Sequence, residues 1–348
     1  MNKKIFGLDI GATTMKLVAL SKDRTGYLLN NAIIAQSPPK GMLSQSPIDE
    51  EEMANAIKKA IEDAKIVTKS ANIALAENQV YTKVIEMPNL SDRELSSAIY
   101  WEAEQQIPVP LSNITLVWNV LKRPEGKNST EKMQVLMVGA PTLLIKKYQK
   151  IIGMAGLTLN ALETEIIATV RALTGGPSQA ANFPPSIVVN IGAVSTSLAI
   201  VRDGIMAFTY SMQIGGSAIN RAIATDFGLT AGQAEEYKKV YGISGKNIGD
   251  RIGQATRPIL ESVLGEVRKA LAFYSQKYSE QKPVRQIVLS GGTAKLPGID
   301  LFFAQNAGLE TVIANPWKVL APQDVPKQII DNAADYTIAV GLAIREDE

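Results

Sequence analysis

The sequence of 348 residues contains neither cysteine nor histidine. The absence of cysteine excludes disulfides, thiolate metal sites and thiol nucleophiles, and it fits a reducing compartment. The absence of histidine removes the usual general base, the Ser-His-Asp triad and the commonest zinc ligand. Acid–base chemistry in this protein would therefore depend on carboxylates.

The sequence also lacks long apolar runs and a large excess of charge. No run of about 18 apolar residues occurs, so we expect no membrane-spanning segment, and residues 1–4 lead directly into a predicted strand without the features of a signal peptide. The 36 basic and 34 acidic residues give a net charge of +2, which favours neither nucleic acid nor acidic lipid as a ligand. We predict a soluble cytoplasmic protein that reaches a membrane only through a partner.

Residues 6–18 are the most informative stretch, because an apolar run ends at Asp9 and a turn of small and hydroxyl residues leads to a second apolar run. This pattern predicts two strands joined by a tight turn. Gly11 lets the backbone approach a bulky ligand, and the N–H groups of residues 12–14 can bind an anion. The hydroxyls and Lys16 add donors for phosphate, and Asp9 can hold a hydrated Mg2+. An ordinary hairpin with a structural aspartate is the alternative.

Residues 187–201 repeat this pattern, with Asn190 at the end of the first apolar run. Such an internal repeat suggests two similar halves, whose hairpins can grip one polyphosphate from both sides. A third stretch, residues 287–298, predicts a strand that runs into a turn at Gly291 and Gly292. These glycines permit close contact with a base or a ribose.

In this order and spacing, the three stretches resemble the phosphate-1, phosphate-2 and adenosine motifs of the actin/Hsp70/sugar-kinase superfamily. Within it the chain is most similar to the PilM family of type IV pilus assembly proteins, which is related to FtsA. The resemblance covers nearly the whole chain and implies an actin-like (ribonuclease H-like, duplicated) two-lobe α/β fold with an FtsA-like 1C-type α+β insert. The closer similarity is carried by residues 86–90, 98–108, 213–216 and 336–343.

The sequence predicts two large domains of sheet and helices, an inserted α+β domain, and a helical subdomain. A terminal helix over residues 334–345 is expected to couple the two halves. The predicted limits are 1–80 with 159–180 for the first large domain (1A-like), 81–158 for the insert (1C-like), 186–215 with 286–348 for the second large domain (2A-like), and 216–285 for the helical subdomain (2B-like).

Capping boxes predict three helix starts, at Asp49, Ser91 and Thr230, each followed three residues later by glutamate or glutamine. The longest apolar pattern with helical spacing predicts a helix over residues 257–278. Residues 123–132 are polar and predict a mobile hairpin loop within the insert.

The resemblance implies roles for three residues. Asp9 would hold, through water, the Mg2+ that bridges the β- and γ-phosphates, or would orient the attacking water. Asn190 stands where the superfamily usually carries aspartate, which removes a full negative charge and predicts weak Mg2+ capture and, at most, slow ATP hydrolysis. Glu165 resembles the water-activating glutamate of actin-like filaments, and a capping role at a helix N-terminus is equally compatible.

Residues 234–238 resemble an Ala-Glu-x-x-Lys segment that contacts ribose and adenine in FtsA and MreB. An ion pair on a helix surface is the alternative for this segment, and a solvent-facing side chain is the alternative for Lys16. The predicted ligands are ATP and Mg2+, with Asp9 and Glu165 as catalytic residues and Asp9 at the metal. The predicted nucleotide-binding residues are Gly11, Ala12, Thr13, Thr14, Lys16, Asn190, Gly192, Ala193, Val194, Ser195, Gly215, Gly216, Glu235, Lys238, Gly291, Gly292, Thr293 and Lys295.

In PilM-like proteins a groove between the first large domain and the insert receives the cytoplasmic tail of the bitopic protein PilN. The resemblance therefore implies a scaffold of the type IV pilus (or related secretion) inner-membrane platform, with a PilN-like partner. Pilus assembly or retraction motor components and a homo-oligomer are further partners left open. Side chains that can face a partner, or belong to the core, are Met42, Leu43, Ile99 and Trp101.

Two other functions remain open. A polymerising FtsA/MreB-like ATPase shares the fold, but FtsA-like membrane binding needs a C-terminal amphipathic helix, and the sequence given ends in the short acidic segment Arg345–Glu348. A small-molecule kinase of the same fold would need a substrate-activating carboxylate and a second ligand pocket. The sequence offers no distinct candidate for either.

Overall fold

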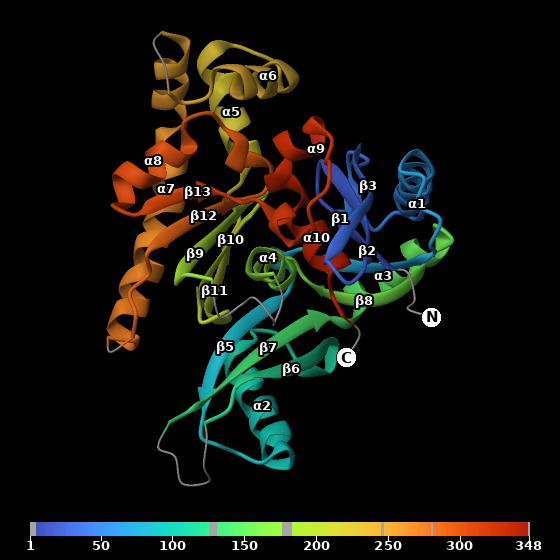
Figure 1. Ribbon diagram of the computed structural model, residues 1–348, viewed down its shortest axis with the longest axis vertical. Coiled ribbons are helices and arrows are strands. Elements are labelled where there is room, and N and C mark those ends of the chain that lie inside the picture. Colours follow the sequence, from blue (N-terminus) through green and yellow to red (C-terminus); the bar gives the residue numbers. More distant parts are fainter. Residues whose placement is uncertain (1–4, 125–130, 176–182, 245–246, 280, 347–348) are drawn as a thin grey trace.

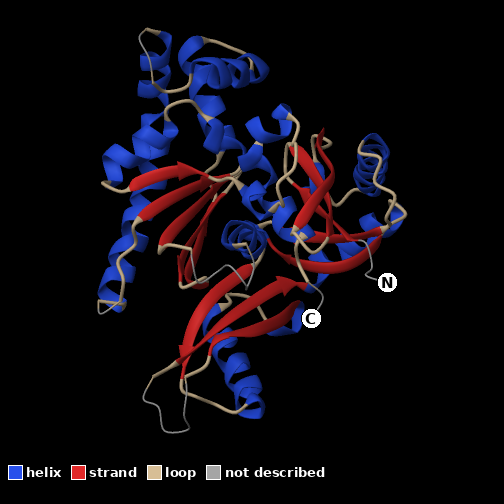
Figure 2. Cartoon of the chain, viewed as in Figure 1, coloured by secondary structure: helices blue, strands red, loops and turns tan. Residues whose placement is uncertain are grey.

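Two five-stranded sheets form the centres of two lobes, and a three-stranded sheet forms a smaller insert beside them (Figure 1). Figure 2 shows that helices surround the two large sheets and that one helix lies along the insert. The computed structural model describes residues 5–124, 131–175, 183–244, 247–279 and 281–346.

The two large sheets have the same topology. Each consists of three antiparallel strands followed by two parallel ones. The first sheet has the order β3 (Tyr27–Gln36), β2 (Thr14–Lys22), β1 (Ile5–Ile10), β4 (Ser70–Leu75) and β8 (Thr158–Thr164). The second has the order β11 (Ile205–Met212), β10 (Thr196–Arg202), β9 (Ser186–Ile191), β12 (Gln286–Ser290) and β13 (Glu310–Ile313). This equivalence confirms the predicted duplicated two-lobe fold, although the sequence analysis did not predict β11.

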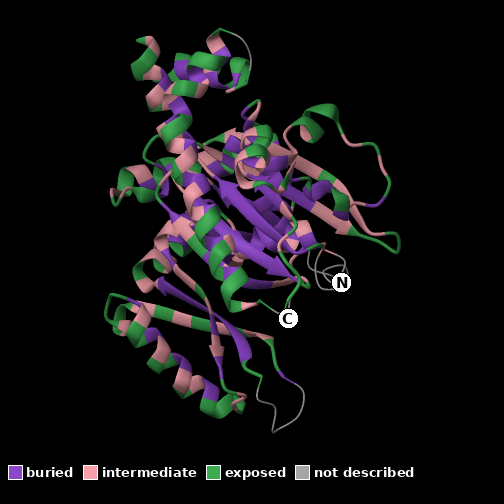
Figure 3. Cartoon of the chain, turned by 90° about the vertical axis from the view of Figure 1, so that its left-hand side faces the viewer, coloured by how far each residue is buried: buried purple, intermediate pink, exposed green. Residues whose placement is uncertain are grey.

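The central strands of both lobes are buried because their sequences are almost continuously apolar. Strands β4, β9 and β10 are buried along their whole length. Figure 3 shows that buried strands occupy the centre of the molecule. The described helices are α1 (Pro47–Asp63), α2 (Asp92–Gln106), α3 (Thr142–Met154), α4 (Glu165–Thr174), α5 (Gly216–Phe227), α6 (Ala231–Tyr241), α7 (Ile248–Lys277), α8 (Ile299–Ala307), α9 (Lys327–Asp331) and α10 (Thr337–Ala343). None of these is both long and apolar enough to cross a membrane.

Two of the three predicted capping boxes are confirmed, at Ser91 before α2 and at Thr230 before α6. The third is wrong: α1 begins at Pro47, with Ser46 as its N-cap, so Asp49 lies inside the first turn. Proline suits the first helical position because it has no N–H to leave unpaired.

Two other helix limits differ from their predictions. Helix α7 begins at Ile248 rather than at residue 257, because its buried face continues upstream through Ile252 and Thr256. The predicted terminal helix over residues 334–345 is shorter, since residues 333–336 form a 3-10 turn before α10.

The insert is an antiparallel sheet in the order β5 (Tyr81–Met87), β7 (Met133–Pro141) and β6 (Ile114–Lys122), with α2 on one face. Most of the predicted mobile loop, residues 125–130, lies outside the described residues. Helix α3 was predicted within the insert, yet its Tyr148, Ile151 and Ile152 belong to the core of the first lobe. We therefore propose to end the insert near residue 141; the other domain limits stay predictions.

Helices α4 and α10 lie between the two lobes. Helix α10 contacts α4, β1, β2 and β4. The approach is so close that a Cβ atom at Gly7 would lie 2.0 Å from the Ala339 carbonyl oxygen, and one at Gly341 would lie 1.9 Å from that of Ala168. Glycine is required at both places, and the terminal helix packs directly on the sheet that carries Asp9.

Candidate functional site

A cavity of about 1060 Å³ opens between the lobes, where the turns after β1, β9 and β12 meet. Every residue predicted to bind nucleotide or to act in catalysis lines this cavity except Gly215. A Cβ atom at Gly215 would lie 2.7 Å from the carbonyl oxygens of Gly192 and Ala193, so this glycine supports the second turn from behind. The structure thus brings together residues from three distant stretches, while their ligand stays a prediction.

The two hairpin turns are closed in the same way. The Gly11 N–H donates to the Thr14 carbonyl at 3.1 Å, and the Gly192 N–H donates to the Ser195 carbonyl at 2.9 Å. The start of α5 is tied to the second turn, because the N–H of Gly216 donates to the Gly192 carbonyl at 2.9 Å. The predicted repeat is therefore a repeat of backbone geometry.

Asp9 and Lys16 form an ion pair at the base of the first turn. They lie opposite each other on β1 and β2, and Lys16 Nζ is 3.5 Å from Asp9 Oδ2. Asp9 is only 3% exposed, and burial raises the pKa of its carboxyl although the charge of Lys16 lowers it. The Lys16 side chain is 12% exposed, so the solvent-facing alternative is wrong.

Glu165 is the first residue of α4, and two hydrogen bonds link the start of this helix to the buried Glu77 of the 3-10 turn Glu77–Gln79. The Glu77 N–H donates to Glu165 Oε2 at 3.4 Å, and the Ile166 N–H donates to Glu77 Oε2 at 3.3 Å. Burial, followed by the charges of Asp9 and Glu77, raises the pKa of Glu165 to about 8. The N-terminus of α4 is therefore capped by Glu77 rather than by Glu165, whose own carboxyl accepts from the Glu77 N–H and is mostly protonated at neutral pH.

Asn190 ends β9 and is buried. Its Oδ1 has no hydrogen-bond partner within the described part of the chain, and a Cβ atom at Gly291 would lie 2.8 Å from it. A buried carbonyl oxygen at a cavity wall normally has a partner, such as water or a ligand. Asn190 thus brings a buried acceptor without a protein partner among the described residues to the wall of the cavity.

Glu235 and Lys238 form the ion pair that the structural alternative predicted, with Lys238 Nζ 2.8 Å from Glu235 Oε2. However, the Lys238 side chain is only 10% exposed, and Asn220 donates a further hydrogen bond to Glu235. A Cβ atom at Gly216 would lie 2.4 Å from Thr293 Oγ1. The pair therefore lies in the packed wall of the cavity rather than on an open helix surface.

The sequence analysis did not identify Glu77, Tyr148 or Asp335. Asp335 contacts Lys295, whose Nζ lies 2.6 Å from its Oδ2, and it adds a charge that raises the pKa of Asp9 after the larger effect of burial. Glu77 lies in the turn that follows the buried strand β4, and this position in the sequence is only a weak indication of a functional residue. The sequence gives no such indication for Tyr148 and Asp335, because only the fold brings α3 and the turn before α10 to the cavity.

The acidic groups do not form a metal centre by themselves. Among the described residues, no three side chains of metal-ligating type are grouped closely enough to hold an ion. Mg2+ characteristically keeps several waters and combines one or two carboxylates with phosphate oxygens. The buried Asp9 carboxylate beside two turns of backbone N–H groups fits that kind of site.

Comparisons with known proteins agree with the two-lobe fold. One chain of a solved PilM-PilN type IV pilus biogenesis complex is 27% identical, with a TM-score of 0.85 over 98% of both chains. The cell division protein FtsA of Streptococcus pneumoniae is 24% identical over 330 residues, which cover 84% of this chain and 71% of FtsA. MreB5 of Spiroplasma citri, solved bound to ADP, shares the fold at 13% identity, with a TM-score of 0.50 over 98% of this chain and 95% of that one.

The match to a protein family covers nearly the whole chain. Residues 7–347 fit the family described as type IV pilus assembly protein PilM. This stretch includes both hairpin turns, the insert and the third glycine turn, so all parts of the candidate site fall within it. The chain belongs to the PilM family of type IV pilus assembly proteins.

Proposed function

We propose that this chain is a cytoplasmic ATP-binding scaffold at the inner-membrane platform of a type IV pilus or a related secretion system. The observation that carries the proposal is the cavity between the lobes, which is lined by two equivalent hairpin turns, one from each lobe. Membership of the PilM family supports the assembly role, and the solved PilM-PilN complex supports a PilN-like bitopic protein as partner.

The cavity residues fit a nucleotide in position and in chemistry. The backbone N–H groups of residues 12–14 and 193–195 would hold phosphate oxygens, and Asp9 would hold Mg2+ through water. Glu235 and Lys238 would contact ribose and base. Bound Mg2+ would supply charge neutralisation for the phosphates. The ADP-bound MreB5, which shares this fold, and the orphan Asn190 oxygen support a nucleotide here.

Two features support slow or absent hydrolysis. Asn190 offers no negative charge on the second lobe, where the superfamily usually has aspartate. The pKa of Glu165, the other candidate base, is raised to about 8. Its carboxyl therefore keeps its proton at neutral pH and is a poor general base. The proposed role of ATP is therefore to fix the relative position of the lobes rather than to drive many turnovers.

The partner tail is proposed to bind in the groove between the first lobe and the insert. Of the four side chains considered for partner contact, Met42 and Ile99 are buried in two hydrophobic cores. Trp101 and Leu43 are 70% and 66% exposed and are available for contact. Lys147 donates to the Met42 carbonyl at 2.6 Å, which holds the Leu43 turn against α3.

Calorimetric titration tests both parts of this proposal. ATP with Mg2+ should bind with a stoichiometry of one, and a peptide from the cytoplasmic tail of a PilN-like protein encoded nearby should bind the same preparation. Trp101→Ala should weaken the peptide and leave ATP binding unchanged. Failure of every such tail to bind would remove the partner, and nucleotide-dependent pelleting would favour an FtsA/MreB-like filament instead.

A further inference from the structure

The insert is joined to the first lobe by the chain but packs on the second lobe. The chain enters it through β5, soon after the Glu77–Gln79 turn, and leaves it through β7, directly before α3. Alternate residues of β7 point to opposite faces of the sheet. Met133, Val135 and Met137 pack toward α2, whereas Leu136 and Val138 belong to a core cluster made mainly of second-lobe residues, with Ile166 and Val170 of α4.

The second-lobe contact involves more than one strand of the insert. Val84 of β5 and Leu121 of β6 also pack against the core of the second lobe, and β11 contacts both strands. Figure 1 shows the insert below β9–β11 and α4, on the far side of α4 from the helices α5 and α6. A hydrophobic interface of this kind resists separation because both apolar faces would be exposed to water.

A polar cluster closes the same interface at the far end of β5. Glu86 Oε1 accepts a hydrogen bond from the Tyr278 hydroxyl at 2.7 Å and lies 3.1 Å from Lys277 Nζ. Gln134 Nε2 donates to the same hydroxyl at 3.4 Å. Burial raises the pKa of Glu86, but the contacts with Tyr278 and Lys277 outweigh it and bring the pKa below its usual value. The carboxylate is thus ionised at neutral pH, and its hydrogen bond is charge-assisted.

The second lobe holds the Tyr278 ring in place for this contact. The Arg202 guanidinium lies 4.9 Å from the centre of the Tyr278 ring. The centre of the Tyr274 ring, on the last turn of α7, lies 5.1 Å from that of Tyr278. The Arg202 side chain is itself largely buried. The hydroxyl that meets Glu86 is therefore presented by a fixed ring rather than by a free side chain.

We propose that the insert moves with the second lobe, as one body, when the nucleotide cleft opens and closes. This inference rests on the proposed nucleotide function. Separation from the second lobe would expose the apolar face of β7 and strip Glu86 of its partners, whereas rotation against the first lobe would disturb mainly Ala140, near the exit from β7, and the two connecting segments. The nucleotide state would then change the groove between the first lobe and the insert, and with it the affinity for a partner tail.

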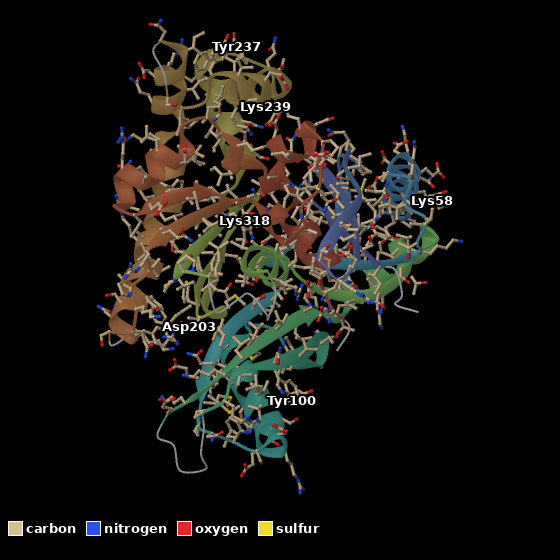
Figure 4. All side chains as sticks on the ribbon, in the orientation of Figure 1. Lys58, Tyr100, Asp203, Tyr237, Lys239 and Lys318 are labelled. Atoms are coloured by element: carbon tan, nitrogen blue, oxygen red, sulfur yellow. The ribbon has the colours of Figure 1, made fainter. Side chains whose placement is uncertain are left out.

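Distances between spin labels on the full chain test this proposal. The chain has no cysteine of its own, so pairs drawn from Lys58→Cys on α1, Gln105→Cys on α2 and Lys269→Cys on α7 can be labelled without background. All three positions are exposed. Figure 4 shows Lys58 on the first lobe, Tyr100 on the helix that carries Gln105, and Asp203 at the turn where the second lobe approaches the insert. Mg-AMPPNP serves as the nucleotide.

The expected result is that both distances from Lys58→Cys shift on adding nucleotide, while the distance between Gln105→Cys and Lys269→Cys keeps its position and width. A shift between the last two labels as large as that between the lobes would overturn the proposal. So would unchanged distances in a protein that binds the nucleotide. Binding is measured separately on each labelled protein by displacement of a fluorescent ATP analogue, and its absence would count against the proposed function.

The polar cluster is tested without nucleotide. Tyr278→Phe and Glu86→Gln keep the shape of the side chains but remove the charge-assisted bond. Each should raise the undocked fraction of the insert about tenfold or more, which widens the distribution between Gln105→Cys and Lys269→Cys. Tyr274→Phe is the matched control, because its hydroxyl donates to the Lys282 carbonyl at 3.0 Å within the second lobe. Distributions as narrow as in the unsubstituted chain would overturn the role of the cluster.

Discussion

The two hairpin turns of the cleft share one backbone geometry and differ in charge. In the first, Asp9 lies opposite Lys16 and forms an ion pair with it. In the second, Asn190 lies opposite Ser197, and the side-chain oxygens of both have no hydrogen-bond partner within the described residues. The repeat thus gives both lobes the same turn geometry, whereas single residues give the two turns different charge.

The same difference extends beyond the turns. The first lobe adds the carboxyls of Glu77 and Glu165 to Asp9, and burial raises the pKa of each. The second lobe presents Lys238 and Lys295, both already paired with acidic side chains. Because the raised pKa values keep protons on Glu165 and favour them on Glu77, Asp9 is the first-lobe carboxylate left to attract a hydrated cation, and the paired lysines of the second lobe attract none.

The largest expected effect on ligand binding comes from making the first turn like the second. Asp9→Asn removes the one carboxylate placed to hold Mg2+, so ATP should bind at least about tenfold more weakly in Mg2+, a loss of about 1.4 kcal/mol. ATP binding in EDTA should hardly change. Thermal melting with ATP, in Mg2+ or EDTA, measures both. Asp300→Asn, at an exposed position, is the control. If Asp9→Asn kept the full Mg2+-dependent gain in Tm, Asp9 would be excluded from the metal site.

The reverse substitution makes the second turn like the first. Asn190→Asp places a carboxylate in a buried position without a cation opposite it, so it should lower the free energy of unfolding by about 2 kcal/mol. MgATP should recover part of this loss, and hydrolysis should become faster. Denaturant unfolding and phosphate release measure these effects, with the exposed Asn119→Asp on β6 as control. Brisk hydrolysis by the unsubstituted chain would contradict this account of Asn190.

The acidity of the first lobe also predicts a pH dependence of stability. Because the folded chain raises the pKa of Glu165 from 4.5 to about 8, the folded state holds more protons than the unfolded state between these values. Stability should therefore fall as the pH rises from about 4.5 to about 8. Glu165→Gln should flatten this slope in urea unfolding curves, whereas the exposed Glu62→Gln should not. An unchanged slope would mean that Glu165 ionises normally.

The parts of the site predicted from the sequence are those determined by local backbone requirements. Gly11 and Gly192 mark turns whose geometry allows little else, and the capping boxes at Ser91 and Thr230 act within three residues. Such features depend on the neighbouring chain, so a single sequence carries them. The repeat suggested two similar halves, and the resemblance of three local motifs to a known superfamily implied the fold.

The parts that were missed depend on contacts distant in sequence. Helix α3 packs on the first lobe because Tyr148 fills that core, although its chain position suggested the insert. Asp335 reaches the cavity only because α10 packs between the lobes. Apolar spacing reports that a face is buried but does not report which partner buries it.

The smallest expected effect tests the neutral character of the second turn. The Ser197 hydroxyl is buried and has no hydrogen-bond partner among the described residues. Ser197→Ala removes a polar group that gains nothing from burial, so the free energy of unfolding should stay within about 0.5 kcal/mol or rise slightly. Affinity for MgATP should also be unchanged, in contrast to a substitution of Lys16, which occupies the equivalent place in the first turn. A clear loss of stability or affinity would show that Ser197 has a partner, and the two turns would then differ less than their charges indicate.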